Sequence, residues 1–167
     1  TIAAIAEHYI NELLQARPKG PFLLCGYSYG GIIALEMGHQ LKERGHEVPL
    51  MVIIDTLAPA RVPKDKPFKR ALLRQRDLIY RWRCANHLRR NEPIPEALRS
   101  FYIIDTYRRA MRHYTARLWE GPLYLIRSAA RGEDLLGWEA LAPHLDGQVI
   151  PGDHFSIVRQ PDVKGLA

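Results

Sequence analysis

The residue of this chain best placed to do chemistry is a serine between two glycines. Ser28 lies in the sequence Gly26-Tyr27-Ser28-Tyr29-Gly30, directly after the apolar run 22–25 and directly before a helical pattern. A strand that turns sharply into a helix strains the residue at the bend, and side chains two positions away on either side would collide, so both flanking positions are expected to be glycine. The spacing therefore predicts a hydroxyl raised clear of a sheet, where it can act as a nucleophile.

The same turn would place Ser28 at the N-terminus of a helix. Backbone N–H groups and the positive end of the helix dipole gather there, and they can hold an oxyanion. The N–H of Tyr29 is the predicted donor within the motif.

Two further polar residues follow apolar runs in the same way. Asp55 ends the run 50–54, and His154 follows the run 148–150 through Pro151-Gly152-Asp153. Another apolar stretch covers 123–126. The run 50–54 does not alternate with polar residues, as expected for a parallel strand covered on both faces, and helical stretches separate the predicted strands. The fold class predicted is therefore α/β, a mostly parallel sheet with helices on both faces.

In such folds the carboxyl ends of the strands carry the chemistry. Ser28, Asp55 and His154 all fall at predicted strand ends. The order serine, acid, histidine along the chain is that of α/β-hydrolases and differs from the orders of trypsin-like and subtilisin-like proteases.

The residues also resemble a known family. The stretch 20–56, the return 107–127 and the segment 151–161 resemble the thioesterase domains that terminate nonribosomal peptide and polyketide synthetases. The resemblance covers nearly the whole chain. It implies an α/β-hydrolase fold with a helical lid, and release of an acyl or peptidyl chain from the phosphopantetheine arm of a carrier protein through an acyl-serine.

Carried over to this sequence, the resemblance makes Ser28 the nucleophile, His154 the general base and later acid, and Asp55 the residue that orients the imidazole. Many α/β-hydrolases instead take their acid from the loop after the next strand, which here offers Glu133 and Asp134. Asp55 is preferred because the family places its acid one strand earlier.

Aromatic residues around these positions are candidates for the substrate pocket. Tyr27 and Phe155 are the two proposed to line it. For Tyr27, packing over the turn that carries the serine is an equally good interpretation.

The insert 59–118 is predicted to be the helical lid, within a single domain that covers 1–167. Helical patterns cover 68–90 and 94–118, and basic residues dominate the first of them. Arg70, Arg74 and Arg81 are the predicted contacts for an acidic carrier domain and its phosphopantetheine phosphate. A solvated helix face is the competing interpretation. Nucleic-acid binding is a third interpretation of the basic residues, but no zinc spacing, RNA-binding signature or helix-turn-helix pattern supports it.

Composition narrows the setting further. The chain has 167 residues, 47% of them hydrophobic and 25% charged, with a formal net charge of +6 and two cysteines. These values are ordinary for a soluble globular domain and provide no secreted-type disulfide framework. No signal peptide, membrane span, metal motif or dinucleotide-binding glycine pattern is visible, so a cytoplasmic protein without a metal or cofactor of its own is expected.

The start of the chain lies inside a helical pattern, 2–14. In α/β-hydrolases the first strands, and the loop that supplies the second oxyanion donor, precede such a helix. We therefore expect a fragment that lacks the N-terminal strands and is poorly active and aggregation-prone when isolated.

The predicted function is thus a chain-releasing thioesterase, by hydrolysis or by macrocyclisation, that works with a carrier domain in the same polypeptide. A stand-alone editing thioesterase and a carboxylesterase share the same fold and remain alternatives. A noncatalytic remnant that only binds a carrier is the alternative from a different class.

Overall fold

The computed structural model describes residues 1–61, 67–132 and 134–166. It divides into two compact units, one formed by Thr1–Val62 with Tyr114–Ala167 and the other by Pro63–His113. Within the described ranges, no helix has the length and apolar character needed to cross a membrane.

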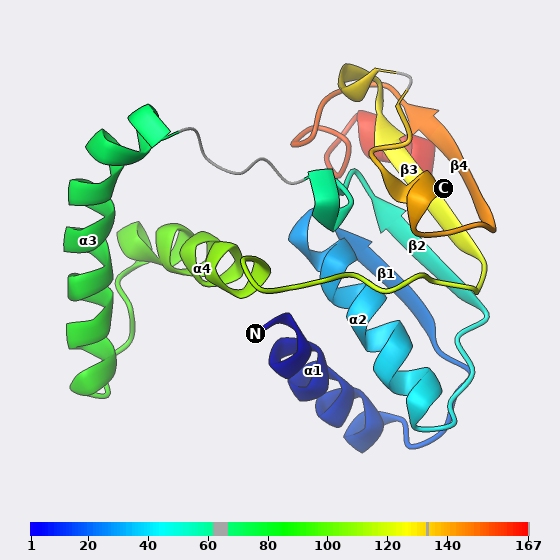
Figure 1. Cartoon of the computed structure of the whole chain (residues 1–167), viewed down its shortest axis with the longest axis horizontal. Helices are drawn as coiled ribbons and strands as arrows, with labels where there is room; N and C mark the ends of the chain where they lie inside the picture. Colours follow the sequence, from blue (N-terminus) through cyan, green and yellow to red (C-terminus); the bar gives the residue numbers. More distant parts are fainter. Residues whose placement is uncertain (62–66, 133, 167) are drawn as a thin grey trace. The chain divides into compact units, whose positions relative to one another are not determined.

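The first unit is built on a parallel sheet of four strands (Figure 1). The strands are β1 (Leu23–Tyr27), β2 (Leu50–Ile54), β3 (Leu123–Ser128) and β4 (Leu145–Ile150), and they lie in the order β1-β2-β3-β4. Tyr27 is in register with Ile54, and Ile54 with Ile126. The carboxyl ends of all four strands therefore lie at the same end of the sheet, as the apolar runs predict.

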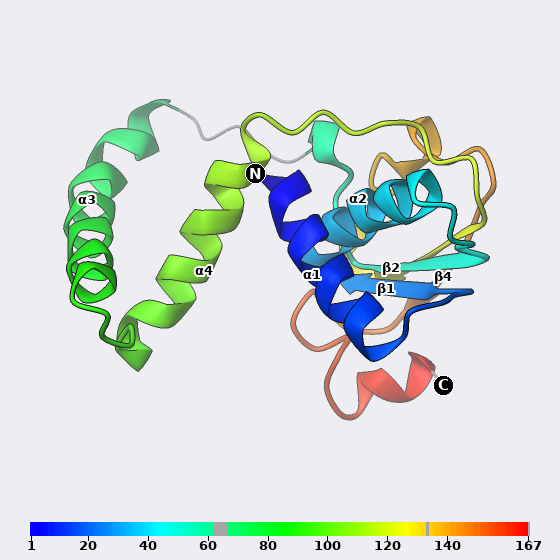
Figure 2. The same ribbon diagram turned by 90° about the horizontal axis from the view of Figure 1, so that it is seen from below.

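Helices α1 (Ile2–Ala16) and α2 (Tyr29–Glu43) pack against each other on one face of the sheet, and the short helix η4 (Asp162–Leu166) lies on the other (Figure 2). The side chain of Thr1 caps α1 by accepting the N–H of Ala4 at 3.1 Å. Buried residues on the helix side of the sheet form the larger core, which includes Leu35, Met51, Ile53, Leu125, Trp119 and Trp138. A smaller cluster of Ile54, Ile126, Ile150 and Ile157 covers the other face. The α/β fold predicted from the sequence is confirmed.

The second unit contains α3 (Pro67–Arg89) and α4 (Glu96–Met111), joined by a short link. Asp105 is almost fully buried, and its two carboxylate oxygens accept from Nε and Nη2 of Arg81 at 2.9 and 2.5 Å. The rings of Tyr80 and Phe101 meet edge to face at 5.1 Å. The two helices thus form a hairpin held by an ion pair and an aromatic contact. The role of the segment 59–118 as a lid stays a prediction.

Candidate active site

Ser28 occupies a strained bend between β1 and α2. Its φ and ψ are 54° and −125°, which is uncommon for a residue with a side chain. The N–H of Ser28 donates to the carbonyl of Ile54 at 3.0 Å, and its carbonyl accepts from the N–H of Gly31 at 3.1 Å and the hydroxyl of Thr56 at 2.7 Å. Such strain persists only where the surroundings hold it, and these three hydrogen bonds do so.

Two glycines, Gly26 and Gly31, allow this bend, whereas the sequence motif indicates Gly26 and Gly30. A Cβ on Gly26 would lie 2.3 Å from the carbonyl oxygen of Gly30, so a side chain is excluded there. A Cβ on Gly30 would meet nothing within 4 Å, whereas one on Gly31 would lie 2.4 Å from Oγ1 of Thr56. The prediction that both flanks need glycine is therefore wrong for Gly30. The tight approach is made by the next residue, because Gly31 is the glycine that faces Thr56.

His154 connects the serine to the acid. Its Nε2 lies 3.1 Å from Oγ of Ser28, and its Nδ1 lies 2.7 Å from Oδ2 of Asp55. An ionised carboxylate can only accept, so Nδ1 carries the hydrogen and Nε2 is left to accept from the serine hydroxyl. The structure thus brings together the three residues that the sequence singles out, in the arrangement of a nucleophile, its base and an orienting acid.

Asp55 is fully buried and saturated with donors. Its Oδ1 accepts from both the N–H and the hydroxyl of Ser128 at 2.8 Å, and its Oδ2 accepts from Nε of Arg131 at 3.2 Å in addition to His154. Burial acts to raise the pKa of this carboxyl. The hydrogen bonds from the Ser128 N–H, His154, the Ser128 hydroxyl and Arg131 outweigh it and hold the pKa below its ordinary value. Asp55 is therefore ionised at neutral pH.

The loop after β3, the rival source of the acid, supplies donors instead. Asp134 is exposed and its Oδ1 accepts the N–H of Leu136 at 3.1 Å, whereas Glu133 lies outside the described residues. Ser128 and Arg131 reach Asp55 from this segment, and sequence reasoning missed both. The position of Ser128 at the end of a strand was a usable signal, but nothing in the sequence marks Arg131.

The aromatic residues of the motif have different surroundings. The hydroxyl of Tyr27 donates to the backbone carbonyl of His154, and its ring stacks on the imidazole at 5.0 Å with an interplanar angle of 25°. These contacts engage the hydroxyl and one ring face of Tyr27, and its place in the substrate pocket stays a prediction. Phe155 is 69% exposed with its ring edge-on to His154, and it stays a candidate substrate contact. Tyr29 begins α2, so its N–H stays the predicted oxyanion donor.

Of the three predicted carrier contacts, only Arg81 has a described side chain. Its guanidinium is bound by Asp105, which joins α3 to α4, and its role as a carrier contact stays a prediction. The side chains of Arg70 and Arg74 lie outside the described residues.

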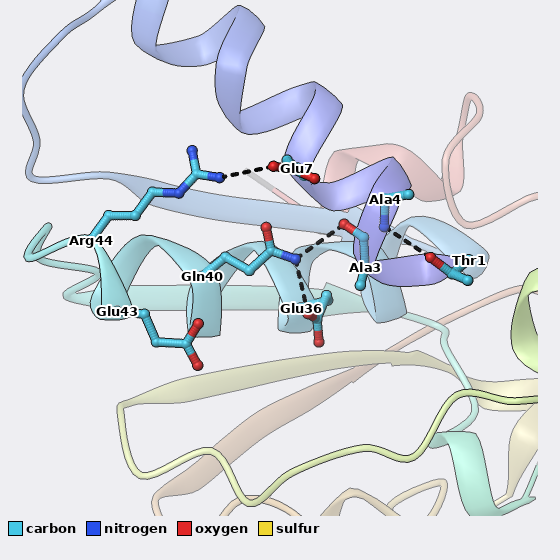
Figure 3. A pocket seen from close by; sticks show the side chains of 8 residues that line it. All are labelled: Thr1, Ala3, Ala4, Glu7, Glu36, Gln40, Glu43 and Arg44. Atoms are coloured by element: carbon cyan, nitrogen blue, oxygen red, sulfur yellow. Dashed lines mark hydrogen bonds and ion pairs between the residues drawn. The ribbon is translucent and has the colours of Figure 1, made fainter.

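A surface pocket of about 470 Å³ lies between α1 and α2 in the first unit (Figure 3). Nε2 of Gln40 donates to the carbonyl of Ala3 at 3.0 Å and to Glu36 at 2.9 Å, and Arg44 lies 3.9 Å from Glu7. These polar groups tie the two helices together. No residue that lines this pocket belongs to the Ser28 site.

Comparison with known proteins identifies the family. A family model described as "Thioesterase domain" matches residues 1–165. Malpinin synthetase of Mortierella alpina is 30% identical over 148 residues, which cover 84% of this chain and 2% of that protein. Chondramide synthase of Chondromyces crocatus is 25% identical over an alignment that covers 99% of this chain and 5% of that protein. The chain therefore spans only a few per cent of the length of these curated relatives.

Solved structures share the fold. A four-domain nonribosomal peptide synthetase bound to AMP and glycine is 28% identical with a TM-score of 0.76, and the match covers 99% of this chain and 15% of that one. The NocB thioesterase domain, in covalent complex with a fluorophosphonate nocardicin G analogue, is 23% identical with a TM-score of 0.73 and is matched over 70% of its length. Because the family model spans nearly the whole sequence, this chain belongs to the thioesterase domain family.

Proposed function

We propose that this domain releases an acyl or peptidyl chain from the phosphopantetheine arm of a carrier protein by way of an acyl-Ser28 ester. The observation that carries the proposal is the hydrogen-bonded series from Ser28 through His154 to Asp55, with separations of 3.1 and 2.7 Å, in a chain of the thioesterase family. A serine alone is a weak nucleophile at neutral pH. A base oriented by an ionised acid is the usual means of activating it.

In the first step, Oγ of Ser28 attacks the thioester carbonyl while Nε2 of His154 takes its proton. The imidazolium that forms is stabilised by the Asp55 carboxylate, whose remaining lone pairs are engaged by Ser128 and Arg131. The oxyanion of the tetrahedral intermediate accepts a hydrogen bond from the N–H of Tyr29. The C–S bond then breaks, His154 returns its proton to the departing thiolate, and the acyl group remains on Ser28.

In the second step, His154 takes a proton from the nucleophile that attacks the acyl-serine. Water would give the free acid, and an amine or hydroxyl of the bound chain would give a lactam or lactone. The C–O bond to Ser28 breaks, and the proton returns to its oxygen. Phe155, exposed beside the imidazole, is placed to contact the acyl chain during this step.

The proposed partner is a carrier domain in the same polypeptide, in the cytoplasm. Names of the matched relatives as synthetases support this setting. The segment around α3 would contribute by electrostatic steering, since Arg76, Arg83 and Arg89 are exposed cations on this helix. In the same proposal the hairpin of α3 and α4 is the lid that shapes the acyl pocket.

The test is covalent labelling of the chain by a fluorophosphonate, read by intact mass and peptide mapping. We expect one adduct, on Ser28, and slow hydrolysis of an acyl-N-acetylcysteamine thioester by the unlabelled chain. Ser28→Ala should abolish both, whereas Ser100→Ala, which changes an exposed serine of α4, should alter neither. Faster turnover of the matching oxygen ester would indicate a carboxylesterase. Absence of any adduct would indicate a noncatalytic carrier-binding domain.

A further inference from the structure

The topology of the sheet poses a problem for the histidine. Ser28 follows β1 and His154 follows β4, and these strands lie at opposite edges of the four-stranded sheet. The segment after β4 must therefore pass the ends of β3 and β2 before His154 can reach the serine. Its first contact is with the turn that follows the neighbouring strand β3, where the N–H of Ala130 donates to the carbonyl of Gly152 at 3.1 Å.

Beyond that point the loop is shaped by its own turn. Oδ1 of Asp153 accepts the N–H groups of Phe155 and Ser156 at 2.7 and 2.9 Å. Ile157 then enters the small cluster of isoleucines on the second face of the sheet. These contacts define the shape of the loop, but none of them ties His154 to β1.

Tyr27 makes that connection. It is the last residue of β1 and directly precedes Ser28. Its hydroxyl donates to the carbonyl of His154, and its ring stacks on the imidazole at 5.0 Å. One side chain thus holds both the backbone and the ring plane of the histidine, from the residue adjacent to the serine that the histidine serves.

The surroundings of Tyr27 keep it suited to this task. Its ring packs on the isoleucine cluster beside Val52 and Tyr124, which limits its movement. Burial raises the pKa of its hydroxyl, and the negative charge of Asp55 adds to the effect. Asp153 acts in the same direction, while Arg131 and Arg159 oppose it. The hydroxyl therefore stays protonated and able to donate.

We propose that Tyr27 is a positioning residue that fixes the main chain and the imidazole of His154 over Ser28. This inference rests on the proposed function, because it assigns Tyr27 a part in activating Ser28. It also explains why the residue before the nucleophile is aromatic and carries a hydroxyl. A pocket-lining residue would need only the ring.

The test compares Tyr27→Phe, which removes the hydroxyl, with Tyr27→Leu, which removes the hydroxyl and the stacked ring. Losing one neutral hydrogen bond that orients the base should slow fluorophosphonate labelling of Ser28 by about tenfold. We expect a further loss in Tyr27→Leu. With a thioester substrate, kcat should fall while KM is unchanged, since Tyr27 would act on the orientation of the base and not on the bound substrate.

Tyr124→Phe is the matched control. Its ring packs on the same isoleucine cluster, so the substitution also removes one hydroxyl there, but Tyr124 makes no contact with His154 among those described. Ser28 of the Tyr124→Phe variant should be labelled by the fluorophosphonate at the native rate. Thermal melts of all three variants monitor folding. If Tyr27→Leu does not fold, Tyr27→Phe, which keeps the ring, still decides the question.

The outcomes separate the two proposals. If the native chain is labelled and Tyr27→Phe is labelled equally fast, the positioning role is refuted and the proposed function stands. A raised KM with unchanged kcat in Tyr27→Phe would refute the positioning role and support a place for Tyr27 in the substrate pocket. If the native chain is not labelled, the proposed function fails, and this inference fails with it.

Discussion

Replacing Asp55 by asparagine would test the reasoning about the site most directly. The two donors of Ser128 converge on Oδ1, so the oxygen of the new amide would remain there. Its NH₂ group would then take the place of Oδ2, facing the N–H of His154 Nδ1 and Nε of Arg131. Two donors cannot share a hydrogen bond. The histidine would therefore move its hydrogen to Nε2, where it points at Ser28 and cannot accept the serine proton.

The size of the effect follows from this change of tautomer. In a serine protease, the same replacement leaves the geometry intact and lowers kcat by about 10⁴. At about 1.36 kcal/mol for each tenfold, we expect Asp55→Asn to cost roughly 5 kcal/mol of transition-state stabilisation. Substrate binding should be little affected, because the carboxylate is fully buried and does not reach the surface.

The assay is thioester hydrolysis, with KM and kcat measured separately for native chain, Asp55→Asn and Asp134→Asn. The last variant removes an exposed carboxylate whose Oδ1 accepts the N–H of Leu136. We expect it to keep native activity. Retention of activity within tenfold by Asp55→Asn, with loss in Asp134→Asn, would show that the acid lies after β3 and would refute the reasoning.

Three further predictions concern folding. Gly31→Ala would place a Cβ 2.4 Å from Oγ1 of Thr56, so we expect a loss of about 1–3 kcal/mol in denaturant unfolding, together with slower labelling of the serine. Arg81→Met would leave the buried Asp105 without its bidentate partner, and faster amide exchange in α3 and α4 should reveal a loss of about 1–3 kcal/mol in the second unit. Burial lowers the pKa of His39, so the unfolded chain binds the proton more readily and stability should fall as the pH drops below about 6.5. Thermal melts between pH 7.5 and 5.5 should show a smaller decrease for His39→Gln than for the native chain.

Much of the fold and of the site could be predicted from the sequence, for a local reason. Apolar runs separated by helical patterns imply parallel strands, and parallel strands bring their carboxyl ends to the same end of the sheet. A polar residue that directly follows such a run must lie at that end. Ser28, Asp55 and the loop that carries His154 could therefore be placed at the same end of the sheet without knowledge of strand order. The family resemblance rested on the same local segments and was confirmed.

Side-chain contacts between segments that are distant in the sequence could not be predicted in this way. Strand order puts β1 and β4 at opposite edges, and this alone creates the need for Tyr27 to hold the histidine loop. The choice of Gly31 over Gly30 as the constrained glycine depends on which face of α2 meets Thr56. Arg81 lies in a basic run that suggests an outward role, and its ion pair exists because α4 folds back to present Asp105. A sequence pattern determines which element a residue joins and at which end. The partner of its side chain is decided by packing, because the groups that meet are separated by up to 127 positions along the chain.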